Sequence, residues 1–211
     1  MKALALVPIL AIGLLAGPSS VQADSSAELW LAPGIKYKLA DDLKLNFTQD
    51  IRFQDDASEL QSIMPTLALS YRLHRNVKIA TGYRYAYKRT GSGDFSNRHR
   101  LHTDGLASYS FGDVKVSYRL RLQSTLKEDE TKSVARNRLA LQYRMNGTTN
   151  GATSVETFHD LSAGFETLRV TVGIEREISG QDVSLFYRYE SPSDAAEDKL
   201  HILGLGFDLS L

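Results

Sequence analysis

After its first two dozen positions, the chain alternates apolar and polar residues along most of its length. In the segment 113–123, for example, the apolar positions 114, 116, 118, 120 and 122 alternate with polar residues that include Lys115, Arg119 and Arg121. A period of two sends successive side chains to opposite faces of a β-strand. The segment therefore predicts a strand with one apolar face and one cationic face.

The same alternation recurs to the end of the chain and predicts eleven strand segments. They cover residues 28–39, 43–54, 60–73, 77–88, 98–111, 113–125, 134–145, 153–160, 167–178, 182–190 and 200–211. Strands of soluble sheets usually have about five or six residues, whereas a tilted strand needs about 9–11 residues to cross a bilayer. The connections alternate between short turns and longer loops, which is the layout of an outer-membrane barrel.

These features predict an all-β fold, namely an antiparallel transmembrane β-barrel of about 12 strands, with about 10 as the alternative. An even count is expected when both chain ends lie on the same side of the membrane. Three explanations of the odd count stay open: a first segment broken at Pro33-Gly34, a further strand within 146–166, or an N-terminal tail inside the lumen. A soluble periplasmic β-sandwich with its apolar face inward also stays open, because alternation does not tell which face is inside.

The N-terminus has the pattern of a secretory signal peptide. Lys2 is followed by an apolar run from Ala3 to Ala16, and small residues precede a cleavage site after Ala23. We therefore expect residues 1–23 to be the signal peptide and residues 24–211 to form one barrel domain. The chain has no cysteine, which excludes a cysteine-linked lipid anchor and a disulfide-stapled fold.

Charge is balanced over the whole chain but not between the two faces of the strands. The formal net charge is zero, so bulk charge predicts no nucleic-acid partner. If the polar face lines the lumen, the basic candidates there are Arg52, Arg72, Arg84, Arg98, Arg100, Arg119, Arg121, Arg136, Arg138, Arg169 and Arg188. Their candidate acidic partners are Asp50, Asp104, Glu156 and Glu175.

A cationic lumen favours a narrow channel for small anionic solutes, because fixed positive charge lowers the barrier to anions. On this interpretation, reversing the charge of Arg119 and Arg121 should lower the preference for anions. The arginines could instead pair with the acids and fill a small barrel, which would then be structural and non-conducting. Both interpretations stay open at this point.

The histidines give little support for catalysis. His102 stands two residues before Asp104, and His159 directly precedes Asp160, but no serine follows a spacing typical of a hydrolase triad. We predict that the protein is not an enzyme and that it has no catalytic residue, no metal site and no cofactor. An outer-membrane hydrolase is the less favoured alternative.

Short motifs recur in a recognisable order across the chain. They are Trp30, Gln49-Asp50-Ile51-Arg52-Phe53, Gly82-Tyr83-Arg84-Tyr85, Arg98-His99-Arg100, Tyr118-Arg119-Leu120-Arg121, Arg136-Asn137-Arg138-Leu139, Glu156-Thr157-Phe158 and Leu168-Arg169. In this order the chain resembles the DUF2490 outer-membrane proteins of Gram-negative bacteria. The resemblance implies a barrel but no activity and no functional residues. A looser similarity to the acidic-oligosaccharide porins of the KdgM type implies twelve strands and a basic lumen, by analogy only.

The last strand segment bears on localisation and partners. Apolar residues alternate through it from His201 to Leu211, which resembles the C-terminal signal of outer-membrane assembly, although that signal usually ends in an aromatic residue. We therefore expect the protein in the cell outer membrane. The expected partners are outer-membrane lipid and lipopolysaccharide, the assembly machinery, and a small anionic solute.

Overall fold

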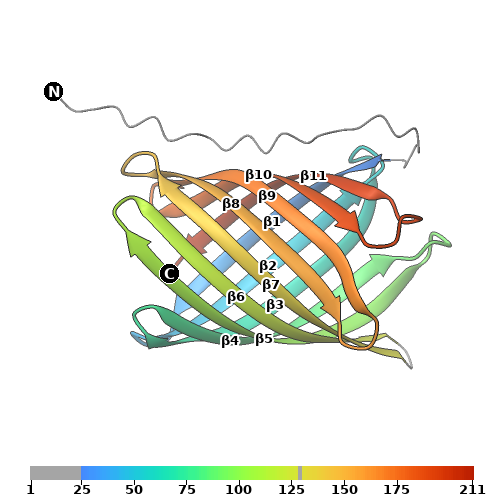
Figure 1. Ribbon diagram of the computed structural model, residues 1–211, viewed down its shortest axis with the longest axis horizontal. Helices are drawn as coiled ribbons and strands as arrows, with labels where there is room; N and C mark the ends of the chain where they lie inside the picture. The colour runs from blue at the N-terminus through green and yellow to red at the C-terminus, as the bar shows by residue number, and fades with distance from the viewer. Residues whose placement is uncertain (1–24, 128–129) are drawn as a thin grey trace.

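The computed structural model describes residues 25–127 and 130–211, which form one closed β-barrel (Figure 1). The signal peptide predicted over residues 1–23 lies outside the described residues. The strands are β1 (Ser25–Lys38), β2 (Leu43–Gln54), β3 (Glu59–His74), β4 (Val77–Arg89), β5 (Phe95–Phe111), β6 (Val114–Lys127), β7 (Glu130–Arg144), β8 (Thr149–Asp160), β9 (Gly164–Ile178), β10 (Gln181–Pro192) and β11 (Lys199–Ser210). Among the described residues no helix is long and apolar enough to cross a membrane.

The barrel has eleven strands, so the prediction of about 12 strands is wrong although the eleven segments themselves are confirmed. The error came from requiring an even count. Each strand pairs antiparallel with its neighbours in sequence, but β1 and β11 pair parallel, from Ser25 opposite Lys199 to Lys36 opposite Ser210. A parallel pair also satisfies the backbone hydrogen bonds, so the barrel closes with an odd number of strands. Strand β1 is continuous through Pro33-Gly34.

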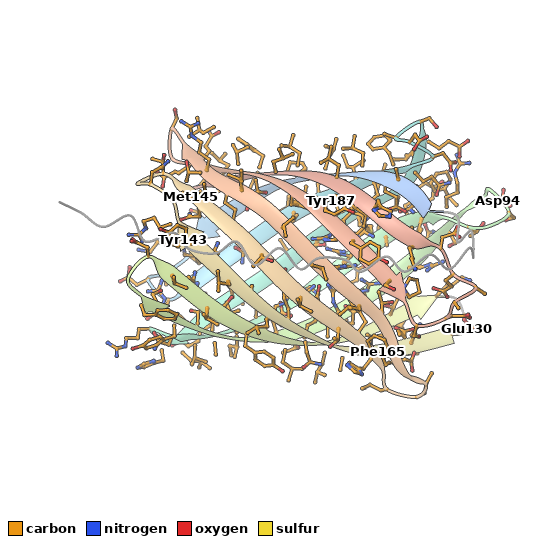
Figure 2. The ribbon with its side chains drawn as sticks, turned by 45° about the horizontal axis from the view of Figure 1, so that its top comes forward. Asp94, Glu130, Tyr143, Met145, Phe165 and Tyr187 are labelled. Carbon is orange, nitrogen blue, oxygen red and sulfur yellow. The ribbon has the colours of Figure 1, made fainter. Side chains whose placement is uncertain are left out.

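The connections at one end of the barrel have two to four residues, and those at the other end have two to six. The short-turn end holds the connections 39–42, 75–76, 112–113, 145–148 and 179–180, and the loop end holds those after β2, β4, β6, β8 and β10. In the β9–β10 turn, Ser179 and Gly180 both have positive φ, at 53° and 78°, which suits a two-residue hairpin. Figure 2 shows Tyr143 and Met145 towards one end, and Asp94 and Glu130 towards the other.

The apolar face of each strand points outward and the polar face points into the lumen. Large apolar side chains are exposed on the outside, among them Leu101, Leu139, Leu185 and Leu203, whereas the fully buried side chains belong to the lumen. The orientation is that of a barrel with an apolar outer belt. It is opposite to that of a soluble sandwich with an apolar core, so that alternative is not the observed fold.

Small residues make room for an inward aromatic ring near the closing seam. Phe186 on β10 lies opposite Gly173 on β9 and Gly204 on β11. A Cβ atom at Gly204 would overlap the Phe186 ring. Glycine at this position therefore allows the ring to lie flat against the barrel wall.

We expect Gly204→Val to destabilise the barrel by about 1–3 kcal/mol, because the new side chain must displace the Phe186 ring. Urea unfolding in detergent micelles, followed by circular dichroism, measures the free energy of unfolding. Gly105→Val is the matched control, because a Cβ at Gly105 meets no atom within 4 Å. Equal stability of the two variants would contradict the role given to Gly204.

Candidate functional site

Charge is concentrated around a cavity of about 540 Å³ in the middle of the lumen. Nine arginines and three carboxylates line it. The arginines are Arg52, Arg84, Arg100, Arg119, Arg121, Arg136, Arg138, Arg169 and Arg188, and the carboxylates are Asp50, Asp104 and Glu156. All twelve were predicted from the sequence as lumen residues, and the barrel brings them together from strands far apart in the chain. We call this space the central cavity.

Glu156 on β8 is the main acidic partner in the central cavity. Its carboxylate accepts hydrogen bonds from both Arg136 Nε and Arg136 Nη2, at 3.1 and 2.9 Å. Arg119 Nη2 lies 2.7 Å from Glu156 Oε1, and Arg169 Nη1 lies 3.3 Å from Glu156 Oε2. The Glu156 residue is only 4% exposed. One buried carboxylate thus stabilises three guanidinium groups.

Further ion pairs hold two more arginines in place. Arg121 donates to both oxygens of Asp104, at 2.6 and 2.7 Å, in a bidentate pair. Arg84 Nη2 donates to Asp50 Oδ2 at 2.5 Å. Such charge-assisted, forked contacts fix the direction of the guanidinium plane. Outside the cavity lining, Glu190 also binds Arg169, at 2.6 Å.

Four arginines of the central cavity have no carboxylate within 4.0 Å among the described residues, namely Arg52, Arg100, Arg138 and Arg188. Two of them are held through their Nε atoms by threonine hydroxyls: Arg100 by Thr125 at 2.9 Å and Arg188 by Thr171 at 3.1 Å. The Nε atoms of Arg52 and Arg138 are buried without a hydrogen-bond partner. The cavity therefore holds more positive charge than its own acids compensate.

The strand register places arginines directly opposite one another. Arg84 pairs with Arg100 across β4 and β5, and across β6 and β7 Arg119 pairs with Arg138 and Arg121 with Arg136. Like charges directly opposite on neighbouring strands are destabilising. In two of the three pairs, only one arginine has a carboxylate partner. Arg100 and Arg138 therefore each face a like charge without a carboxylate partner of their own among the described residues.

Aromatic rings inside the lumen support the arginines. The Arg52 guanidinium lies 3.5 Å from the centroid of the Trp30 ring, and Arg188 lies 4.7 Å from both Trp30 and Phe186. Arg136 and Arg169 lie 4.3 and 4.5 Å from Phe158. Cation–π contacts of this kind stabilise by about 0.5–2 kcal/mol.

The lumen is filled in its loop-end half. Inward side chains there are buried: Glu28, Trp30, Ser62, Met64, Ala86, Gln123, Val134, Asp160, Glu190 and Ile202. Ser62 and Ile202 have no exposed surface. Hydrogen bonds connect these side chains, since the Glu28 carboxylate accepts one from Trp30 Nε1 at 2.6 Å and one from Gln61 Nε2 at 2.5 Å. We call these ten residues the loop-end plug.

The short-turn half is open. A second cavity, of about 530 Å³, shares Asn46, Asp104, Arg119 and Arg138 with the central cavity. A third cavity, of about 380 Å³, shares Lys36 and Glu175 with the second and reaches the β7–β8 turn. The cavities thus form a continuous series from the central cavity to the short-turn end.

The remaining predicted site residues lie outside the central cavity. Arg72 is exposed at the short-turn end, where it lies 3.7 Å from Asp42. Arg98 points inward from β5 but does not line the cavity. Glu175 forms no salt bridge among the described residues and instead accepts a hydrogen bond from Gln142 at 2.5 Å.

Sequence reasoning missed the inward aromatic residues. Trp30, Phe158 and Phe186 contact four of the arginines, yet none was predicted as a site residue. The alternation contained this information. Phe186 stands two positions from Arg188, and Trp30 stands two positions from Glu28, so each pair lies on the same face of its strand.

His102 and His159, the two histidines considered for catalysis, lie in different surroundings. His102 is buried beside Gly82, and its Nδ1 has no hydrogen-bond partner in the described structure. His159 Nε2 lies 3.2 Å from Thr157 Oγ1. Within residues 25–127 and 130–211, no group of three or more acidic or histidine side chains is placed to hold a metal ion.

The geometry defines a class: a closed, outer-membrane-like β-barrel with buried salt bridges in its lumen. The family described as "Protein of unknown function (DUF2490)" matches residues 27–201, and the chain belongs to this family. No curated protein matches the chain.

One solved structure, with a TM-score above 0.5, supports the class of fold. The chain is similar to a "Bacterial polysaccharide outer membrane secretin", with 10% identity and a TM-score of 0.53, over 80% of this chain and 64% of that one. It also matches the outer-membrane protein OmpT of Vibrio cholerae, with 11% identity and a TM-score of 0.41, over 71% and 54% of the two chains. The chain therefore spans less than two thirds of either structure.

We expect Glu156→Gln to lower the free energy of unfolding by about 3–5 kcal/mol, because it leaves three buried guanidinium groups without their shared counter-charge. Urea unfolding of the refolded barrel in micelles measures the change. Glu177→Gln makes the same substitution at the exposed short-turn end and should have little effect. Similar losses in both variants would show that Glu156 is not a main stabilising partner.

Proposed function

We propose that the protein is an outer-membrane barrel that acts as a narrow channel for small anionic solutes and is not an enzyme. The observation that carries the proposal is the set of four cavity arginines without a carboxylate partner among the described residues. Arginine stays charged at every physiological pH, so the cavity is permanently cationic. Fixed charge of one sign lowers the barrier to ions of the opposite sign.

The location in the outer membrane is supported by the outer surface of the barrel. Tyr37, Tyr71, Tyr109, Phe111 and Tyr143 are exposed near the short-turn end. Aromatic residues at this depth, next to an apolar belt, suit a membrane–water interface. The proposed export route is a signal peptide over residues 1–23, followed by recognition of β11 by the assembly machinery.

The proposed orientation follows from the connections. Outer-membrane barrels have short turns on the periplasmic side and longer loops on the extracellular side. The loop end would therefore face the outer leaflet, with lipid and lipopolysaccharide as its surroundings. The central cavity would open towards the periplasm.

A second candidate is a non-conducting structural barrel. The loop-end plug favours it, because ten inward side chains of that half are buried. In that case the ion pairs of Glu156, Asp104 and Asp50 would stabilise the fold, and no continuous path would cross the barrel. The two candidates differ in conductance, which can be measured directly.

We expect discrete, anion-selective current steps when the refolded barrel is inserted into planar bilayers under a potassium chloride gradient. Arg138→Gln should shift the reversal potential towards zero, because it removes a cavity charge that has no carboxylate partner. Arg138 is a sharper test than Arg119 and Arg121, which are both ion-paired. Arg75→Gln, in the β3–β4 turn, is the matched control and should leave selectivity unchanged.

Folded barrels without conductance would establish the structural candidate and refute the channel. Current steps that keep their selectivity in Arg138→Gln would remove this residue from the ion path.

A further inference from the structure

We infer that the central cavity binds an anion with two or more separated negative groups, carboxylates or phosphates, which enters from the short-turn end. The inference deepens the proposed function, since it rests on the same cationic lumen. It adds a bound ligand class, a set of binding residues and a direction of access.

The positions of the four arginines without a carboxylate partner among the described residues indicate how many separated negative groups the ligand carries. Arg52 stands on β2, Arg100 on β5, Arg138 on β7 and Arg188 on β10. In the closed barrel each is therefore two or three strands from the next, all the way around the wall. Neighbouring strands lie about 4.8 Å apart, so the backbones that carry successive arginines of this set are about 10–14 Å apart, which is a wide spacing for one monovalent ion. A ligand with several separated charges suits this spacing.

The four guanidinium groups keep hydrogen-bond donors for a ligand. The hydrogen bonds of Arg100 and Arg188 to threonine use only Nε, and Arg52 and Arg138 form none with described residues. Contacts with Trp30 fix Arg52 and Arg188 before any ligand arrives. Arginines held in this way suit bidentate binding of carboxylates and phosphates, because little side-chain freedom is lost on binding.

The route to this cavity begins at the short-turn end. Inward cations there include Lys44, Lys78, Lys115 and Arg144, none of which has a carboxylate within 4.0 Å in the described part of the chain. The opposite wall, formed by β9 to β11, carries the acids Glu177, Asp182 and Asp208, and Lys36 bridges the last two. An entering anion is therefore drawn along the wall from β2 to β7. Beyond the central cavity, the loop-end plug narrows the path.

Trp30 reports on the site directly. It is the only tryptophan of the chain, and its ring contacts two of the four arginines. We expect citrate, with three carboxylates, to change the tryptophan fluorescence of the refolded barrel in a saturable way. Acetate at the same ionic strength should cause no saturable change, because it has one carboxylate. Equal responses to citrate and acetate would overturn the inference.

Single substitutions test whether these arginines bind the ligand. Arg138→Gln should weaken citrate binding about tenfold, the usual effect of losing one charged hydrogen bond. Arg100→Gln, which also leaves the Trp30 contacts intact, gives a second reading if the first variant does not fold. Arg75→Gln is the control of equal charge change and should bind citrate like the unaltered protein. Unchanged affinity in folded Arg138→Gln and Arg100→Gln would overturn the assignment.

Further measurements distinguish phosphate from carboxylate ligands, and the binding site from the channel. Pyrophosphate in place of citrate distinguishes phosphate from carboxylate ligands, and saturable binding of either one supports the inference. Saturable binding without any conductance would support the site and refute the channel. Anion-selective conductance without saturable binding of either probe would support the channel and refute the site.

Discussion

The closed ring of backbone hydrogen bonds is the constraint on which the rest of the structure depends. Eleven strands leave no free edge only because β1 and β11 pair parallel. Closure gives every strand one inward and one outward face, so a shift of one residue in any register would turn its arginines towards the apolar surroundings. The Tyr-Arg dipeptides on β3, β4, β6, β7 and β10 fit this requirement, with tyrosine outward and arginine inward.

Closure of the barrel also brings the arginines of neighbouring strands together in one lumen. Two strands that both carry arginines at alternate positions place them opposite each other, as in the pair of Arg119 and Arg138. Glu156 offsets part of this repulsion, because it lies opposite Arg138 on one neighbouring strand and opposite Arg169 on the other. Its side chain nevertheless binds Arg136, Arg119 and Arg169, so Arg138 is left without a counter-charge. The surplus of positive charge in the lumen thus has two causes: the strand register, which sets the position of each arginine, and the contacts of the Glu156 side chain, which do not include Arg138.

Much of the fold could be predicted from the sequence, because alternation of period two shows which segments form strands and which side chains share a face. The eleven segments and the inward placement of residues such as Arg84 and Asp104 required nothing more. The parallel seam could not be predicted, since the pairing of the first and last strands leaves no local pattern. The cross-strand arginine pairs could not be predicted either. Each pair depends on the exact register of two neighbouring strands, which is set by the length of the turn between them. Trp30 and Phe186 were missed for a different reason: only charged residues of the inward face were considered as site residues.

The loop-end plug favours a structural barrel and the four arginines without a carboxylate partner among the described residues favour a channel, but the two features belong to different parts of one lumen. Carboxylates of the plug, such as Glu28 and Glu190, are engaged with groups of their own half, Trp30 and Gln61 in one case and Arg169 in the other. They are therefore not available to Arg138, which borders the open series of cavities. A barrel that needed only stability could replace an uncompensated buried arginine by a neutral residue at a gain, because burying an unpaired charge is costly. Packing alone therefore does not account for four such arginines around one cavity, and the proposed anion would supply the counter-charge that they lack among the described residues.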